Sequence, residues 1–264
     1  MRSGTVPLMT HRTFGRKFDS RVSICIPFYK ELPLLRLQRR YSKKFGVKLQ
    51  FLFDEKLLRK RRFFWVKMLG ETFRNSGNSI EQGYADFVKK ARRNWVLRMD
   101  SDEVLNLKGL QFLDQFDLDE NHVVGFLRYQ VVLLEDNFYV LSNSEFNPNQ
   151  HVQWRLFNRK FGSFGSDEIH NPGFKLIDRN SFLSPPDCAI YHLDFVVRDH
   201  ESRVSKSLRY FKLGQDNHMQ RFQILSEKDW QLMPVPDLEI LDFLNENIQL
   251  LKKSRSISLN WEKE

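Results

Sequence analysis

Cysteine is scarce in this sequence, and its scarcity limits the chemistry that the chain can carry. Among 264 residues only Cys25 and Cys188 are cysteines, and neither belongs to a Cys-x-x-Cys pair or to a Cys/His cluster with zinc-finger spacing. The absence of both patterns excludes a structural zinc site of that kind. A reducing, cytoplasmic setting fits best.

Long apolar runs are also missing. Nowhere does the sequence offer the ~18 consecutive apolar residues of a membrane span, and its first twenty residues carry five basic side chains without an apolar stretch of signal-peptide length. We expect a cytoplasmic protein that is soluble or at most peripheral on the inner face of the membrane. Gly77 and Gly83 lack the spacing of a phosphate-cradling loop, so we interpret both as structural.

Apolar and aromatic residues are plentiful: 41% of the chain is hydrophobic and 14% aromatic, with 24 phenylalanines. A chain of this length and composition can bury a substantial core, which favours one sizeable domain with an appended part. We expect an N-terminal extension over residues 1–20, a main domain over residues 21–213 and a helical C-terminal extension over residues 214–264.

Positive charge dominates, with a formal net charge of +9. It gathers around Arg39 to Lys44, Lys56 to Arg62 and Lys89 to Arg93. An anionic counterpart is therefore expected, and nucleic acid, an acidic membrane surface and a phosphorylated substrate all satisfy that condition. Each run taken alone is equally typical of a solvated helix face.

Short apolar segments alternate with helical patterns in the first half of the chain, which predicts an α/β fold with a mostly parallel sheet flanked by helices. The expected strands are 22–28, 48–53, 62–68 and 95–99, and the expected helices are 31–45 and 78–92. Beyond residue 120 we expect strands over 123–134, 138–141 and 152–157, followed by helices over 203–213 and 238–251.

Two of these predicted strands end in acidic residues. Asp54 and Glu55 follow the second strand, and Asp100 and Asp102 follow the fourth. In open α/β sheets ligands bind beyond the carboxyl ends of the strands. Asp100 and Asp102 have the spacing that lets a turn direct both carboxylates at one oxygen-ligated Mn²⁺ or Mg²⁺ ion, although a pair of this kind can also simply cap the turn.

The segments around these acids resemble family 2 glycosyltransferases. Val-Ser-Ile-Cys-Ile-Pro-Phe-Tyr-Lys-Glu, residues 22–31, is similar to the opening strand of that family, and Trp-Val-Leu-Arg-Met-Asp-Ser-Asp-Glu-Val, residues 95–104, is similar to its metal-binding segment. Trp-Arg-Leu-Phe-Asn-Arg, residues 154–159, resembles its arginine-bearing strand. Tyr-His-Leu-Asp-Phe, residues 191–195, with the basic helix that follows, resembles its later histidine region.

The resemblance spans residues 20–213 and implies a GT-A fold that transfers sugar with inversion from a UDP- or GDP-sugar, dependent on Mn²⁺ or Mg²⁺. It implies roles residue by residue. Asp100, Asp102 and His192 match metal ligands of the family, and Asp100 also matches a residue that binds the sugar donor. The remaining donor-binding positions that it implies are Pro27, Tyr29, Glu31 and Asp54. Arg203 and Lys206 on the basic helix are our candidates for a diphosphate clamp.

Inverting transfer also needs a carboxylate that takes the proton of the acceptor hydroxyl. Asp167 and Glu168 are our candidates, in a Gly- and Pro-containing loop after the arginine-bearing strand. Many relatives have a His-Glu pair here, where this chain has His170-Asn171. If neither Asp167 nor Glu168 is the base, Glu103 and Asp194 are the next candidates.

The function expected from these features is transfer of a sugar to a hydroxyl of a glycan or lipid-linked acceptor, in cell-surface polysaccharide or lipopolysaccharide synthesis. The partners are then a nucleotide sugar, that acceptor and the surface of an acidic membrane, with no nucleic acid. Two alternatives stay open. A nucleotidyltransferase also uses strand-end acids and a metal, but normally has a Gly-rich basic loop where this chain has Pro-Phe-Tyr-Lys-Glu. A non-catalytic basic protein could bind nucleic acid or acidic membrane.

Overall fold

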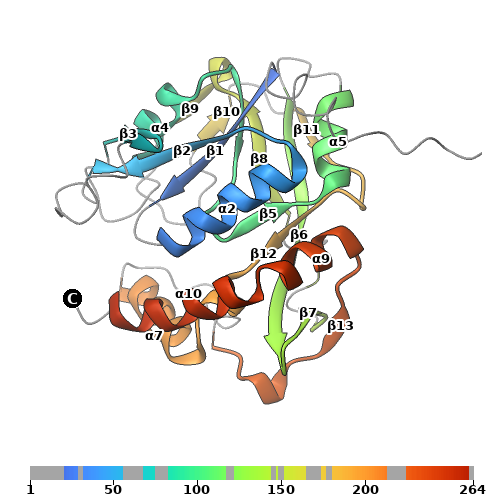
Figure 1. Cartoon of the computed structure of the whole chain (residues 1–264). Helices are drawn as coiled ribbons and strands as arrows, with labels where there is room; N and C mark the ends of the chain where they lie inside the picture. The colour runs from blue at the N-terminus through green and yellow to red at the C-terminus, as the bar shows by residue number, and fades with distance from the viewer. Residues whose placement is uncertain are drawn as a thin grey trace, which may run out of the picture.

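One sheet contains most of the strands in the computed structural model of the chain (Figure 1). The structure describes residues 21–28, 32–55, 68–74, 83–116, 122–143, 147, 152–164, 174–176, 180–212 and 224–261. Four neighbouring strands are parallel, in the order β3-β2-β1-β4. They are β1 (Val22–Phe28), β2 (Leu49–Asp54), β3 (Glu71–Phe73) and β4 (Trp95–Arg98).

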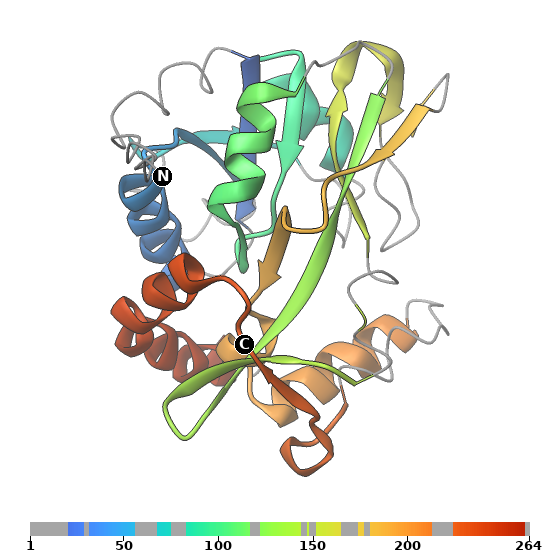
Figure 2. The same cartoon turned by 90° about the vertical axis from the view of Figure 1, so that its right-hand side faces the viewer.

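The sheet continues beyond β4 with both antiparallel and parallel pairs. Strand β8 (Gln153–Asn158) pairs with β4 and with the long strand β6 (His122–Leu134), which runs from one half of the molecule into the other (Figure 2). Strand β6 pairs further with β7 (Asn137–Leu141), β11 (Asn180–Leu183) and β12 (Ala189–His192), and β12 with β5 (Glu103–Leu105). The remaining strands are β9 (Gly162–Phe164), β10 (Phe174–Leu176) and β13 (Leu232–Pro234).

Helices cover both faces of this sheet. On one side α2 (Leu32–Phe45) and α5 (Leu107–Gln115) lie near the parallel strands, and α10 (Ile248–Trp261) crosses below them in Figure 1. On the other side α4 (Tyr84–Lys90) contacts β3 and β9. The other helices are α6 (Asp194–Val197), α7 (His200–Lys212), α9 (Leu238–Glu246) and the 3₁₀ turns η5 (Arg159–Phe161) and η6 (Glu227–Asp229).

Strand β1 shows why this arrangement suits the sequence. All seven of its residues are buried, as expected for a strand with helices on both sides. Ile24 and Ile26 belong to the larger core, beneath α2, whereas Cys25 belongs to a second core that contains Phe87 of α4. Pro27 has no N–H to donate to a neighbouring strand. It is tolerated because the pairing of β1 with β4 ends at Cys25, so no residue of β4 lies opposite Pro27.

The α/β class predicted from the sequence is confirmed, with a parallel group of strands flanked by helices. The predicted strands 22–28, 95–99, 123–134, 138–141 and 152–157 are present within about one residue of their expected bounds, as is the helix that ends before Gly46, whereas the helix expected over 203–213 begins earlier, at His200. Gly46 has φ 67°, a left-handed conformation typical of the residue after a helix.

Three predicted elements differ in the structure. The helix expected over 78–92 is α4, which spans Tyr84–Lys90, and residues 78–82 lie outside the described residues. Most of the strand expected over 62–68 lies outside the described residues, and the strand that pairs with β2 is β3, which begins at Glu71. The helix expected over 238–251 is divided into α9 and α10 at Asn247. The side chain of Asn247 donates to the carbonyl oxygen of Phe243 at 2.7 Å, so it is bonded locally where the first helix ends.

The C-terminal residues pack against the rest of the described chain. Strand β13 pairs with β7, and α10 contacts α2 and α6. Two basic residues of α2 also point to this region: Arg40 donates to Asn247 Oδ1 at 2.9 Å, and Lys44 pairs with Glu246 at 2.8 Å. Part of the first basic run therefore binds within the protein. No helix among the described ranges has both the length and the apolar character needed to cross a bilayer.

Candidate metal centre

A tight turn carries the acidic residues from β4 into β5. Glu103 donates its backbone N–H to the carbonyl oxygen of Asp100 at 3.0 Å, and the Glu103 carboxylate accepts from the N–H of Asp100 at 2.9 Å. The buried side chain of Gln38 on α2 donates to the carbonyl oxygens of Ser101 and Glu103 at 2.9 and 2.8 Å. These bonds hold the turn against α2 and fix the direction of its side chains.

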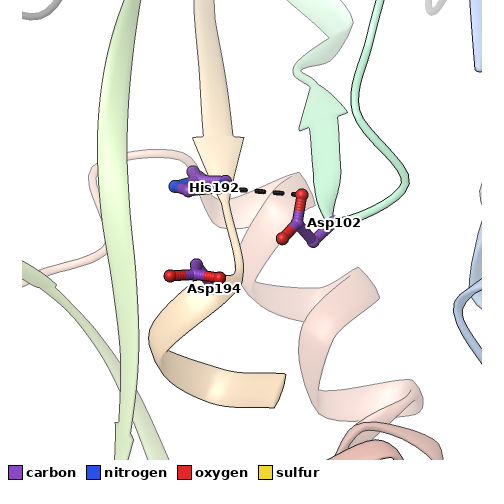
Figure 3. Close-up of side chains that lie close together, drawn as sticks. All are labelled: Asp102, His192 and Asp194. Atoms are coloured by element: carbon purple, nitrogen blue, oxygen red, sulfur yellow. Dashed lines mark ion pairs between the residues drawn. The ribbon is translucent and has the colours of Figure 1, made fainter. Parts of the chain in front are cut away.

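Strand β12 brings a second group of residues to this turn. It pairs antiparallel with β5, with His192 opposite Glu103, and Leu193 then donates its N–H to the carbonyl oxygen of Asp102 at 2.8 Å. Asp194, the first residue of α6, follows at once. One ligand atom from each of Asp102, His192 and Asp194 lies within 4.8 Å of the others (Figure 3).

Gln130 of β6 holds the imidazole of His192 from the opposite side. Its side-chain nitrogen donates to the carbonyl oxygen of His192 at 3.2 Å, which leaves its oxygen 2.8 Å from His192 Nδ1. This bonding pattern assigns the ring proton to Nδ1. The lone pair of Nε2 then faces Oδ1 of Asp102 at 3.6 Å. Histidines that bind metals commonly donate their other ring N–H to an oxygen acceptor, as His192 does to Gln130, so the arrangement suits a metal ligand.

Two basic side chains lie on the same carboxylates. Arg198 Nη1 donates to Asp102 Oδ2 at 3.1 Å and also to Asp194 Oδ1. Lys206 of α7 donates to the same Asp194 oxygen at 3.0 Å. Both basic side chains are 15% exposed, whereas the Asp194 side chain is only 2% exposed. Two negative and two positive groups therefore balance here.

Asp100 belongs to a neighbouring network rather than to this cluster. Its two carboxylate oxygens accept from Arg98 at 2.9 Å and from Arg155 at 2.8 Å. Arg155 also donates to the fully buried Glu103 at 2.8 Å, and Arg128 lies 4.0 Å from the same carboxylate. The structure thus brings Asp102 and His192 together and places the Asp100 carboxylate against other partners, and the expected sharing of one ion by Asp100, Asp102 and His192 stays a prediction.

Burial and charge set the protonation of these groups. Burial alone raises the pKa of Asp100, but the guanidinium groups of Arg155 and Arg98 reverse the shift and hold its pKa below the usual range. Burial likewise acts to raise the pKa of Asp102, yet the positive charges beside it, those of Arg198 and Lys206, hold its pKa well below the usual value. Burial lowers the pKa of His192 despite the nearby Asp102, so its imidazole is neutral at pH 7, as a metal ligand must be.

The other residues expected in the site occupy several places. Lys206 reaches the cluster, whereas the structure does not bring Arg203 there. The Arg203 guanidinium is buried 3.9 Å from the ring centre of Phe195 and donates to the carbonyl oxygen of Leu225 at 3.2 Å. Pro27 and Asp54 are buried near the ends of β1 and β2. The candidates outside the described residues are Tyr29, Glu31, Asp167 and Glu168.

Sequence reasoning did not assign a metal-binding role to Asp194, or any role to Gln130 and Arg198. For Asp194 a signal was present, since it stands two residues after His192 in the segment that resembled the histidine region. Gln130 lies in the middle of a long strand, where nothing in the sequence marks it. Its proximity to His192 follows from the pairing of β6 with β12, in which the two residues are opposite each other.

A cavity of about 510 Å³ lies on the other side of β12. Tyr191 and Tyr129 line it, together with the starts of α5 and α9. Because neighbouring residues of a strand point to opposite faces, Tyr191 faces this cavity and His192 faces the acidic cluster. None of Asp102, His192 and Asp194 lines the cavity.

Comparisons with known proteins do not assign the chain to a family. No family model and no curated protein matches the sequence. Several solved structures share limited similarity with it, among them the following three. TarS 1-349 from S. aureus is 12% identical with a TM-score of 0.36, over 77% of this chain and 69% of that one. HddC from Yersinia pseudotuberculosis is 11% identical with a TM-score of 0.35, over 65% and 93%. The inositol-1-phosphate CTP transferase from T. maritima is 11% identical with a TM-score of 0.29, over 89% and 97%.

Proposed function

We propose that this protein is a metal-dependent glycosyltransferase that moves a sugar from a nucleotide-sugar donor to a hydroxyl of a glycan or lipid-linked acceptor. One observation carries the proposal: Asp102, His192 and Asp194 converge within 4.8 Å. They do so beside the carboxyl end of β4, where ligands of open α/β sheets bind. The resemblance of the surrounding segments to family 2 glycosyltransferases supports the same assignment.

The three residues fit a divalent ion of the Mn²⁺ or Mg²⁺ type. Two carboxylates and one imidazole form a mixed oxygen and nitrogen donor set, which Mn²⁺ accepts more readily than Mg²⁺. The Nε2 atom of His192 is directed at Asp102 by the bond that Gln130 makes to Nδ1. Such an ion, when bound, would supply positive charge to the diphosphate that leaves as the sugar is transferred.

The basic residues of the cluster would bind the same diphosphate. Arg198 and Lys206 both reach Asp194, and both are partly exposed, so their charged ends lie next to the candidate ion site. A guanidinium forms two parallel hydrogen bonds with phosphate oxygens, and an ammonium acts as a point charge. We assign them to donor binding, with Asp54 on the nucleotide side, and leave Arg203 to the packing of α7 against Phe195.

A carboxylate must still take the proton of the acceptor. We keep Asp167 and Glu168 as the candidates, with residues 21–213 as the transferase domain. The Asp102 and Asp194 carboxylates are unsuited to this role if they bind the ion, and Asp100 is paired with two arginines. Replacement of the true base by its amide should abolish sugar transfer but preserve donor binding. D167N and E168Q should therefore bind the donor alike, and only the variant that lacks the base should lose transfer.

The proposal is tested by the combined binding of metal and nucleotide. UDP and GDP are each added to the protein with and without Mn²⁺, and the midpoint of thermal unfolding is measured. We expect one nucleotide to raise the midpoint by several degrees only when Mn²⁺ is present, and D102N to remove this effect. D229N is the matched control, because Asp229 lies in η6 and bonds to Ser226 outside the cluster.

The product of the reaction separates this function from its rivals. Nucleotide sugars are then screened for Mn²⁺-dependent release of the nucleoside diphosphate. Release of pyrophosphate from a nucleoside triphosphate, without turnover of any nucleotide sugar, would indicate a nucleotidyltransferase instead. Tight DNA or RNA binding that weakens steeply with salt, and no nucleotide effect, would indicate a nucleic-acid-binding protein.

Contact with an acidic membrane is a further part of the proposal, since a lipid-linked acceptor would be presented there. The net charge of +9 supports it, although Arg40 and Lys44 bind within the protein. Co-sedimentation with vesicles that contain an anionic lipid, compared with neutral vesicles, tests this part separately from the transferase activity.

A further inference from the structure

Arg198 occupies a particular position relative to the candidate metal ligands. One nitrogen, Nη1, bonds to Asp102 Oδ2 at 3.1 Å and to Asp194 Oδ1. These two residues are also members of the group that can hold an ion. The guanidinium therefore bridges the pair of carboxylates that the ion would bridge.

A divalent ion and this guanidinium cannot both be stable against the same two carboxylates. The groups carry charge of the same sign and would lie a few ångströms apart in a largely buried site, where like charges interact strongly. Lys206 adds a second positive charge on Asp194. With Arg198 and Lys206 in place, the two carboxylates are already neutralised, so an ion alone gains little from them.

The Arg198 side chain is partly exposed to solvent, at 15%. The residue follows α6 with an extended backbone, φ −124° and ψ 135°. A diphosphate brought to the cluster would offer the guanidinium new oxygen partners, with the bidentate geometry that arginine favours. The release of the carboxylates to the ion and the capture of the diphosphate by Arg198 would then support each other.

From this arrangement we propose that Arg198 is a positioning residue that makes binding of the divalent ion depend on binding of the nucleoside diphosphate. The inference rests on the proposed function and extends it to the order of events: the metal alone binds weakly, and metal and diphosphate enter together. By linkage, each ligand raises the affinity of the other by the same factor. Arg198 supplies that coupling because it is bonded to the metal ligands in one state and to the phosphate in the other.

The test measures Mn²⁺ binding without catalysis. Free Mn²⁺ is followed by its electron paramagnetic resonance signal during titration of the wild type and of R198Q, with and without UDP or GDP. We expect R198Q to bind Mn²⁺ alone about tenfold more tightly than the wild type, and the nucleotide to enhance Mn²⁺ binding about tenfold less in R198Q than in the wild type. R198K, which keeps the charge but cannot form the paired hydrogen bonds of a guanidinium with phosphate, should lie between them and serves if R198Q does not fold.

R92Q is the matched control. Arg92 is an exposed arginine that also pairs with a carboxylate, that of Glu71, but it lies outside the cluster, so its loss removes the same charge without freeing Asp102 or Asp194. R92Q should bind Mn²⁺ as the wild type does. Equal Mn²⁺ affinities of R198Q and the wild type would overturn the inference. If Mn²⁺ still bound with nucleotide in that case, the proposed function would stand; if Mn²⁺ bound under no condition, both would fail.

Discussion

The backbone N–H of Leu193 bonds to the carbonyl oxygen of Asp102 at 2.8 Å, which fixes the end of β12 to the turn before β5. Because His192 and Asp194 precede and follow Leu193 in the chain, this bond brings both of them close to Asp102. The spacing of the three candidate ligands is therefore set by backbone pairing, and substitutions of their side chains should change metal binding more than the fold.

The first prediction concerns which acid binds the ion. D102N and D194N should each weaken Mn²⁺ binding, measured by titration with the nucleotide present, by at least about tenfold, because each loses an anionic ligand. D100N should change the Mn²⁺ affinity by less than about threefold, since the Asp100 carboxylate is bonded to Arg98 and Arg155 instead.

The comparison of D100N with D102N decides between the two sets of ligands. An Asp100 variant that loses Mn²⁺ as completely as the Asp102 variant would restore the set expected from the sequence, Asp100 with Asp102 and His192. It would also require the pairing of Asp100 with the two arginines to change when the ion binds.

The second prediction concerns Gln130, which holds the imidazole of His192. Q130L removes both bonds to His192, and loss of such an orienting partner typically lowers metal affinity by about 10- to 100-fold. The tautomer of His192 gives a separate readout: nitrogen NMR should show the proton on Nδ1 in the wild type and a mixture of tautomers in Q130L. Q111L, which changes a residue that lines the separate cavity, should leave both quantities unchanged.

The sequence was sufficient for the fold class and for the acidic turn, because both depend on local patterns. The alternation of apolar segments gave strands such as β1 and β4, and the acids stand directly after β4. The partners of those acids depend on pairing between distant strands. His192 was suggested by its segment, but the position of Gln130 opposite it follows only from the register of β6 with β12.

The different partners of Asp100 and Asp102 were also beyond the sequence. Asp-x-Asp spacing allows both carboxylates to face one point, and here the buried Arg155 draws Asp100 to a different side. Arg203 and Lys206 are one helical turn apart, yet only Lys206 reaches Asp194, because Phe195 and Trp230 offer their ring faces to Arg203. Composition and spacing along the sequence do not reveal which rings a distant side chain will pack against.

The third prediction concerns the dependence of stability on pH. The pKa of His192 is lower in the folded chain than its usual ~6.5, so as the pH falls below that value the unfolded chain binds a proton first and the free energy of unfolding decreases. The pKa of Asp100 is also lowered on folding, so its contribution is present above about pH 4 and is lost as the pH falls further.

Urea unfolding at a series of pH values measures both effects. H192Q should lose less free energy of unfolding between about pH 7 and 5 than the wild type, and D100N should lose less below about pH 4, because each variant lacks the group that titrates in that range. Parallel curves for H192Q and the wild type over the upper range would show that His192 is not the group responsible.

The last prediction concerns the arginine that joins Asp100 to Glu103. Arg155 Nη2 lies 2.8 Å from a carboxylate oxygen of each, and the Glu103 side chain is fully buried. R155M would leave that buried charge with only Arg128, 4.0 Å away, and the N–H of Asp100, so the free energy of unfolding should fall by about 3–5 kcal/mol. R92M breaks an exposed pair with Glu71 and should cost less than about 1 kcal/mol.

E103Q in the R155M background should recover part of the loss, because the neutral amide no longer needs a cation. A double variant less stable than R155M would mean that Arg155 acts through packing rather than charge.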